Sequence, residues 1–138
     1  MAKKRSNNNT QKIAVKIINM LRGKMIIHKY NASSTNSVYF KFDYGVANSL
    51  RISDHPGYNY LAYRYNIIIG LKEPYIDNSG KFPKEYYPET MAETVVKKII
   101  DSRQEKMNRY FGYSQIVEKQ KLKPDHTKSF WKNCIEIK

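Results

Sequence analysis

The chain has 138 residues, 41% of them hydrophobic and 27% charged, and its 25 Lys and Arg against 12 Asp and Glu give a net charge of +13. This length and composition predict one globular domain and exclude a largely disordered chain. The longest apolar run, Ile67 to Ile69, is far shorter than the ~20 residues of a membrane-spanning helix. The sequence starts without the apolar block of a secretion signal, and its single cysteine, Cys134, cannot form an internal disulfide. We therefore expect a cytoplasmic protein with no membrane partner.

The positive charge is concentrated at the start of the chain. Residues 1–42 contain nine Lys and Arg and no acidic residue, and the first acidic residue is Asp43. The remaining 96 residues are close to balanced, with sixteen Lys and Arg against twelve Asp and Glu. A segment of one sign predicts a phosphate-bearing or polyanionic partner. Nucleic acid, a nucleotide and an acidic protein all remain open.

The chain divides into a disordered basic tail over residues 1–9, a single α+β domain over 10–122 and a C-terminal extension over 123–138. Thr10 is a typical N-cap for an amphipathic helix that ends at Gly23. Its apolar stripe consists of Ile13, Ile17, Met20 and Leu21. Its opposite face carries Lys12, Lys16, Asn19 and Arg22.

Alternating or apolar residues predict strands at residues 25–30, 38–44, 49–53 and 60–69. Short links between them favour antiparallel pairing. Residues 71–89 contain three prolines and a turn sequence, which is typical of a loop.

Thr90 and Glu93 form a capping-box pattern that predicts a long helix ending at Gly112. A shorter helix is expected over residues 114–121. The predicted fold is α+β, with an antiparallel sheet of three to five strands, an N-terminal helix, and the long C-terminal helix packed on one face.

Arg103 falls in the middle of the apolar stripe of the long helix, one turn after Ile99 and one turn before Met107. Burying a guanidinium without a partner is costly, so an anion should lie opposite it. Two partners remain open: an internal Asp or Glu, or the phosphate of a ligand held in a pocket or at a subunit interface.

Three further residues are candidates for ligand binding. Arg51 and Arg64 alternate onto the strand face opposite the apolar set, where two arginines could clamp a phosphate or simply face solvent. Phe82 lies between Lys81 and Lys84, where a ring could stack on a base or pin the loop to the core.

Catalysis has little support in the sequence. The three histidines have no metal-ligand spacing, and neither a phosphate-binding Walker loop nor a GxGxxG string occurs. We therefore expect no metal, no cofactor and no enzymatic activity, while a small metal-independent RNase stays open.

Several strings resemble small bacteriophage proteins: Ser37-Val38-Tyr39, Leu50-Arg51-Ile52-Ser53-Asp54-His55-Pro56-Gly57 and Tyr63-Arg64-Tyr65-Asn66. Together with Lys81-Phe82-Pro83 and the helix that contains Arg103 and Arg109, they resemble the phage anti-Thoeris sponge family. That resemblance implies a homo-oligomer in the host bacterial cytoplasm that sequesters a cyclic ADP-ribose-type immune signal without catalysis. It also implies that Phe82 stacks on the base and that Arg103 and Arg109 hold the diphosphate.

The organisation of the chain is also similar to that of broad-spectrum anti-CRISPR proteins of streptococcal phages. The shared features are a basic N-terminus, a following helix, an Arg-x-Ser-x-His string at a strand end and a later long helix. This resemblance implies inhibition of Cas9 through its guide RNA or nucleic-acid-binding surface, and it uses the basic residues 1–42.

Overall fold

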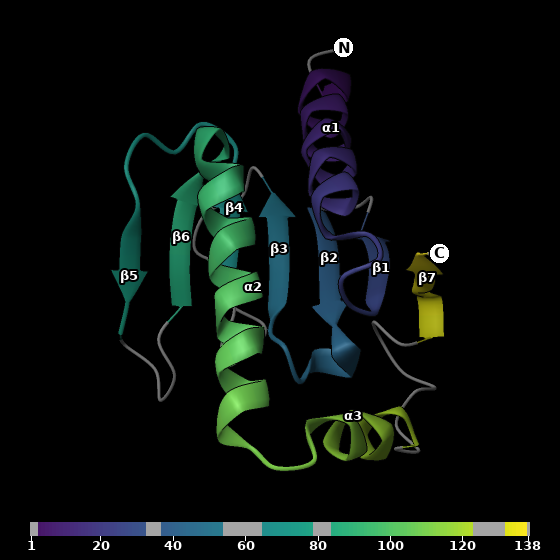
Figure 1. The fold of residues 1–138 in the computed structure, drawn as a ribbon. Helices are drawn as coiled ribbons and strands as arrows, with labels where there is room; N and C mark the ends of the chain where they lie inside the picture. The colour runs from purple at the N-terminus through teal and green to yellow at the C-terminus, as the bar shows by residue number, and fades with distance from the viewer. Residues whose placement is uncertain (1–2, 33–36, 54–64, 79–83, 123–131, 138) are drawn as a thin grey trace.

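The structure is a computed structural model that describes residues 3–32, 37–53, 65–78, 84–122 and 132–137. Within these residues a single sheet of seven strands has the order β5-β6-β4-β3-β2-β1-β7 (Figure 1). The strands are β1 (Ile27–Ala32), β2 (Ser37–Phe42), β3 (Ser49–Ser53), β4 (Tyr65–Ile68), β5 (Tyr75–Asp77), β6 (Lys84–Pro88) and β7 (Ile135–Ile137). The helices are α1 (Lys3–Leu21), α2 (Ala92–Arg109) and α3 (Tyr113–Lys121).

The protein is α+β, but the expected antiparallel sheet of three to five strands is wrong. Strand β4 pairs in parallel with both β3 and β6, while the other neighbours in the sheet are antiparallel. The prediction assumed short links between consecutive strands, but residues 54–64 separate the end of β3 from the start of β4, which is long enough for the two neighbours to pair in parallel. Here β5 lies outside β6 at the edge, so β4 and β6, which are separated by β5 in the chain, become neighbours.

The strands missed by the sequence prediction are β5, β6 and β7. Two of them are only three residues long and mostly exposed at the edges of the sheet. Strand β6 lies in the proline-containing segment that resembled a loop, and its proline stands at the last position of the strand. Short edge strands carry no apolar alternation, because little of their surface is buried.

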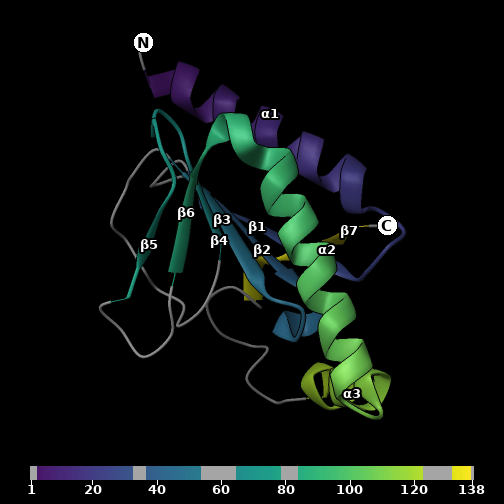
Figure 2. The same cartoon turned by 60° about the vertical axis from the view of Figure 1, so that its left-hand side comes forward.

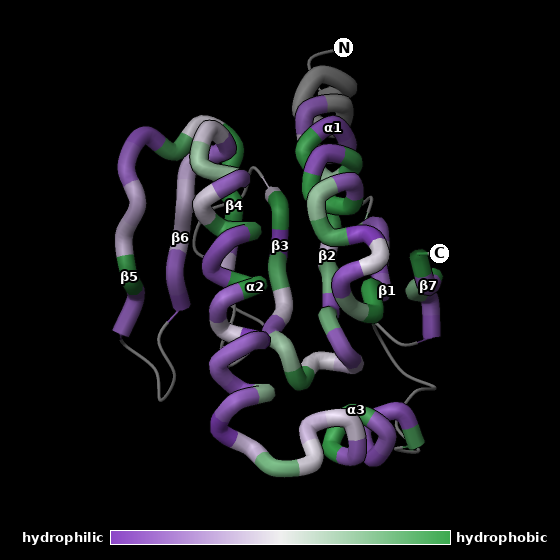
Figure 3. Tube along the Cα trace, in the orientation of Figure 1, coloured by the Kyte–Doolittle hydropathy of each residue, from purple (hydrophilic) through white to green (hydrophobic). Residues whose placement is uncertain are grey.

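Helices α1 and α2 cover the same face of the sheet (Figure 2). The core lies between them and the central strands, where the inward residues include Val38, Phe40, Leu50, Ile52 and Ile67, all with 0% of their surface exposed. Hydrophobic residues lie along β2 and β3, and much of α2 is hydrophilic (Figure 3). The apolar stripes of both helices thus face the same side of the sheet, whereas the sequence predicted a face for the long helix alone.

The helix boundaries differ from the predicted ones at three points. Helix α1 begins at Lys3, so residues 3–9 are helical where the sequence predicted a disordered tail. Helix α2 follows a single 3₁₀ turn (Glu89–Met91), and Met91, not Thr90, stands at its N-cap without a side-chain hydrogen bond. Helix α2 ends at Arg109 and not at the predicted stop, Gly112, which has a φ of 77° and turns the chain into α3. None of the helices among the described residues is both long and apolar enough to cross a bilayer.

Candidate functional site

A cleft of about 860 Å³ lies between residues 23–26, the C-terminal half of α2 and helix α3. Its lining combines cationic and aromatic side chains, among them Lys24, Arg103, Arg109, Tyr110 and Phe111. The left-handed Gly112 allows α3 to fold back beside the end of α2 and form one wall. The volume falls within the range of small-molecule sites in proteins, roughly 300 to 1,000 Å³.

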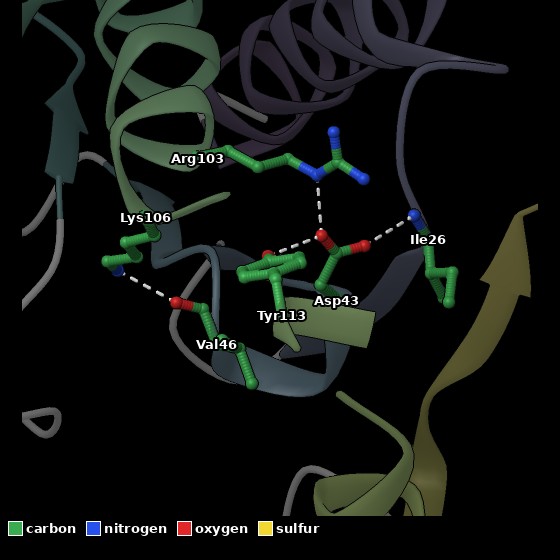
Figure 4. A network of polar contacts seen from close by, with 6 residues as sticks. All are labelled: Ile26, Asp43, Val46, Arg103, Lys106 and Tyr113. Carbon is green, nitrogen blue, oxygen red and sulfur yellow. Dashed lines mark hydrogen bonds and ion pairs between the residues drawn. The ribbon is translucent and has the colours of Figure 1, made fainter. Parts of the chain in front are cut away.

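Asp43 is the central residue of a hydrogen-bond network at the base of this cleft (Figure 4). Its carboxylate is only 3% exposed. Oδ1 accepts a hydrogen bond from the backbone N–H of Ile26 over 3.0 Å, and Oδ2 accepts from Arg103 Nε over 2.6 Å and from the Tyr113 hydroxyl over 2.6 Å. One buried carboxylate therefore connects the start of β1, helix α2 and helix α3.

Arg103 uses only one of its three nitrogens to contact Asp43. Its bond is made by Nε, and among the described residues neither terminal nitrogen has a partner. Figure 4 shows the Asp43 contact at Nε alone, with one terminal nitrogen pointing away from the carboxylate. The side chain is 24% exposed and lines the cleft. Asp43 thus fixes the guanidinium through Nε, and the two terminal nitrogens can still donate as a planar pair to an anion.

Tyr113 stabilises the same arrangement from α3. Burial raises the pKa of its hydroxyl well above the ordinary value, and the hydrogen bond to Asp43 and the negative charge of that carboxylate raise it further. The hydroxyl therefore remains a donor to Asp43 across the physiological range. The Arg103 guanidinium lies 5.7 Å from the centre of the Tyr113 ring, close enough for a cation–π contact.

The turn that carries Asp43 has an unusual backbone. Asp43, Tyr44 and Asn48 have φ values of 50°, 58° and 102°, in the left-handed region that favours glycine. Lys106 of α2 holds this turn by donating from Nζ to the carbonyl oxygen of Val46 over 2.7 Å. Burial lowers the pKa of Lys106, and the nearby Glu105 partly opposes that change. Contacts from α2 and α3 therefore support a conformation that costs backbone energy.

The mouth of the cleft is cationic and aromatic. Arg109 Nη2 donates to Glu105 Oε1 over 2.9 Å, an exposed pair one helical turn apart. Phe111 is fully exposed and Tyr110 is 48% exposed, although both are large rings. An exposed ring beside arginines is typical of sites that stack on a flat ligand and neutralise its charge.

The structure brings together two of the five predicted ligand-binding residues. Arg103 and Arg109 both line the cleft. Phe82 and Arg64 lie outside the described residues, so the predicted stacking of Phe82 and the clamp of Arg51 with Arg64 stay predictions. Of the two partners considered for Arg103, the internal carboxylate is confirmed, since Asp43 contacts Nε, and the phosphate of a ligand stays a prediction.

Arg51 lies on the opposite face of the sheet from the helices, which is the face the sequence assigned to it. The alternative that it faces solvent is wrong, because only 1% of its surface is exposed. Its Nη2 donates to Ser37 Oγ over 3.2 Å, and its guanidinium lies 5.5 Å from the centre of the Tyr39 ring. Arg51 is therefore not part of the cleft.

A row of polar and aromatic residues crosses this far face of the sheet. Strand register places Asn66 between Arg51 and Tyr86, and Tyr39 follows on the other side of Arg51. Asn66 is 0% exposed, and neither its amide nitrogen nor its amide oxygen has a partner among the described residues. We refer to Tyr39, Arg51, Asn66 and Tyr86 as the sheet row.

The sequence prediction missed Asp43, Tyr113, Tyr110 and Phe111. One signal for Asp43 was present, since it is the first acidic residue after 42 residues without any. Its partner Arg103 is 60 residues later, and Tyr113 is 70 residues later. Such a long-range triplet follows only from the packing of α2 and α3 against the turn after β2.

No group of three or more His, Cys, Asp and Glu side chains within the described part of the chain is arranged to hold a metal ion. No protein-family model matches the chain, and no curated protein or solved structure matches it significantly. The two resemblances to phage families therefore stay predictions.

Proposed function

We propose that this protein binds a phosphate-bearing small ligand in the cleft and sequesters it without making or breaking a bond. In this proposal it is a phage counter-defence protein that captures a cyclic ADP-ribose-type immune signal in the host bacterial cytoplasm. The homo-oligomer implied by the sponge family is part of the same proposal.

The proposal rests on the contacts that the Arg103 guanidinium makes and leaves open. A buried Asp43 fixes its Nε, the Arg103 side chain lines the cleft, and its two terminal nitrogens have no hydrogen-bond partner among the described residues. A guanidinium held in this way matches two oxygens of a phosphate without first having to become ordered. A solvated surface arginine would have no such support.

The rest of the lining suits a nucleotide. Lys24 and Arg109 add positive charge, and Tyr110 and Phe111 present rings on which a purine can stack. The volume of about 860 Å³ accommodates a molecule with a base, sugars and a diphosphate. Sequestration needs only a preformed pocket, charge neutralisation and slow release.

The first test identifies the ligand. Purified protein is incubated with extract from bacterial cells in which a nucleotide-signalling defence is active, then heat-denatured, and the released small molecules are analysed by mass spectrometry. Recovery of a cyclic ADP-ribose-type molecule supports the proposal. Recovery of nucleic acid alone would favour the alternative, an inhibitor of Cas9 that acts through its guide RNA.

The second test measures binding of cyclic ADP-ribose and ADP-ribose by calorimetry. Arg103→Met removes the donors, and Arg103→Lys keeps the charge but not the planar pair. Loss of charge-assisted hydrogen bonds, about 1.5–3 kcal/mol, should weaken binding roughly ten- to 150-fold in Arg103→Met. The matched control is Lys97→Met, which removes an exposed cation of the same helix that is paired with Asp101. Equal affinity of Arg103→Met and Lys97→Met would reject the cleft as the binding site.

A further inference from the structure

Helix α1 presents a second cationic surface, which adjoins the cleft at Lys24. Lys12, Lys16 and Arg22 are exposed, and exposed Lys24 follows the end of the helix. We call these four residues the basic face of α1. Among the described residues none of their side chains has an ion-pair or hydrogen-bond partner.

The Lys and Arg side chains of helix α2, in contrast, are mostly paired with carboxylates. Four of the five Lys and Arg of α2 contact a carboxylate: Lys97, Lys98, Arg103 and Arg109. The basic face of α1 has no such neutralisation, and no acidic residue occurs before Asp43. Unneutralised like charges on one surface repel each other, and an external anion relieves that repulsion.

We propose that the basic face of α1 binds the sugar-phosphate backbone of a nucleic acid. Lys12 and Lys16 lie one turn apart, about 6 Å along the helix axis. One strand of duplex DNA carries a charge about every 3.4 Å along its axis, so each lysine can reach a different phosphate. Backbone contacts of this kind do not depend on sequence.

The same helix does not suit a membrane surface. An interfacial helix inserts an apolar face between lipid headgroups. The apolar residues of α1 are used in the core, since Ala14, Ile17 and Leu21 are 0% exposed. Among the α1 residues whose side chains the structure describes, Val15 is the only large hydrophobic one that is exposed, at 52%.

An acidic protein is also a poorer match. Protein interfaces depend on buried aromatic or arginine anchors at their centre, surrounded by a polar rim. The exposed side of α1 offers lysine, asparagine and Arg22 and no aromatic ring. Flexible, solvated lysines are better suited to contacts with phosphates than to a place in a packed protein interface.

The basic face of α1 also leads to the cleft. Gly23 and Lys24 line the cleft and directly follow Arg22. A strand bound along α1 would therefore pass close to the cleft mouth. Binding to the helix needs neither Arg103 nor Asp43, so the two proposals can fail independently.

The test uses the full chain and short fluorescein-labelled DNA, one probe duplex and one single-stranded, with affinity measured by anisotropy. The variant combines Lys12→Gln, Lys16→Gln and Arg22→Gln. Between about 50 and 200 mM salt, log K should fall linearly with log salt, and the slope should shrink by about 2 to 3 in the variant. Affinity at the lower salt concentration should fall at least ~tenfold.

A matched control removes three exposed lysines elsewhere, with Lys72→Gln, Lys119→Gln and Lys121→Gln. It has the same net charge as the variant, so a general charge effect would weaken both proteins equally and overturn the proposal. Failure of the unaltered protein to bind either probe at about 50 mM salt would also overturn it. So would equal or tighter binding to phosphatidylserine vesicles that is lost in the same variant. Arg103→Met should leave DNA binding unchanged, and circular dichroism should show that every variant is folded.

Discussion

The cleft and the sheet row each contain an arginine among buried polar groups, but the two regions leave these arginines in different states. Arg103 is 24% exposed in its side chain, contacts Asp43 through Nε, and lines a cavity. Arg51 is 1% exposed and contacts Ser37 and the ring of Tyr39. Arg103 comes from α2, which covers one face of the sheet, and Arg51 comes from β3 and lies on the opposite face.

The difference shows what turns a cation in a fold into a binding group. A guanidinium enclosed by its own chain stabilises the fold and is not accessible to a ligand. A guanidinium with one nitrogen anchored and the others at a cavity is already oriented, and a ligand gains from that orientation. Sequence alternation predicted the correct face of the sheet for Arg51, but it did not predict that the side chain is buried.

Replacing Asp43 should cause the largest loss of stability. Asp43→Ala removes the carboxylate that pairs with Arg103 and the acceptor of Ile26 and Tyr113, and it places alanine at a φ of 50°. Breaking a buried pair costs about 3–5 kcal/mol of unfolding free energy. Asp43→Asn should lose less, because asparagine tolerates this φ and keeps one acceptor oxygen.

Urea denaturation measures these differences, and Asp101→Ala provides the control. Asp101 forms an exposed pair with Lys97, and such pairs contribute about 0–1 kcal/mol. A loss in Asp43→Ala no larger than in Asp101→Ala would show that the network around Asp43 does not hold the cleft together.

Arg51→Ala should cause the next largest loss, about 3 kcal/mol, because it removes a fully buried side chain and its contacts with Ser37 and Tyr39. Arg51→Met, which keeps most of the volume, should lose less. Affinity for cyclic ADP-ribose, measured on folded protein, should stay unchanged in both. A weaker ligand affinity in a stable Arg51→Met protein would move the binding site to the sheet row.

Asn66→Leu should have the smallest effect, within about 1 kcal/mol of the unaltered protein. The two side chains have nearly the same shape, and the buried amide has no partner among the described residues. Replacing an unsatisfied polar group by an apolar one of the same shape is nearly neutral or stabilising. Thermal unfolding tests this, with Asn66→Asp as the comparison, because a buried carboxylate is much more costly. A loss of several kcal/mol in Asn66→Leu would reveal a bound polar partner at the sheet row.

Part of the cleft could be predicted from the sequence, and the reason is local periodicity. Arg103 stands in the apolar stripe of α2, which required an anion near it. Arg109 was predicted only through the resemblance to the sponge family. The identity of the anion could not be predicted, because Asp43 lies 60 residues earlier in the chain. Tyr110 fits the apolar stripe of the long helix and was therefore interpreted as a core residue, while Phe111 gave no periodic signal; both stand in the turn between α2 and α3.

For the fold, too, the sequence predicted the elements that follow from local patterns. Alternation identified β2 and β3, a short apolar run identified β1, and the start of α3 was predicted within one residue. These elements follow from short-range rules, since each buries one face and exposes the other.

The sequence by itself determined the excess of positive charge, its position before Asp43, the α+β class and the amphipathic helices, because these depend on composition and on neighbours within a few residues. Only the tertiary structure decided the parallel pairing of β4 with β3 and β6, the enclosure of Arg51, and the contact between Asp43, Arg103 and Tyr113. Each of these depends on which distant segments meet, and that depends on how all the buried faces pack at once.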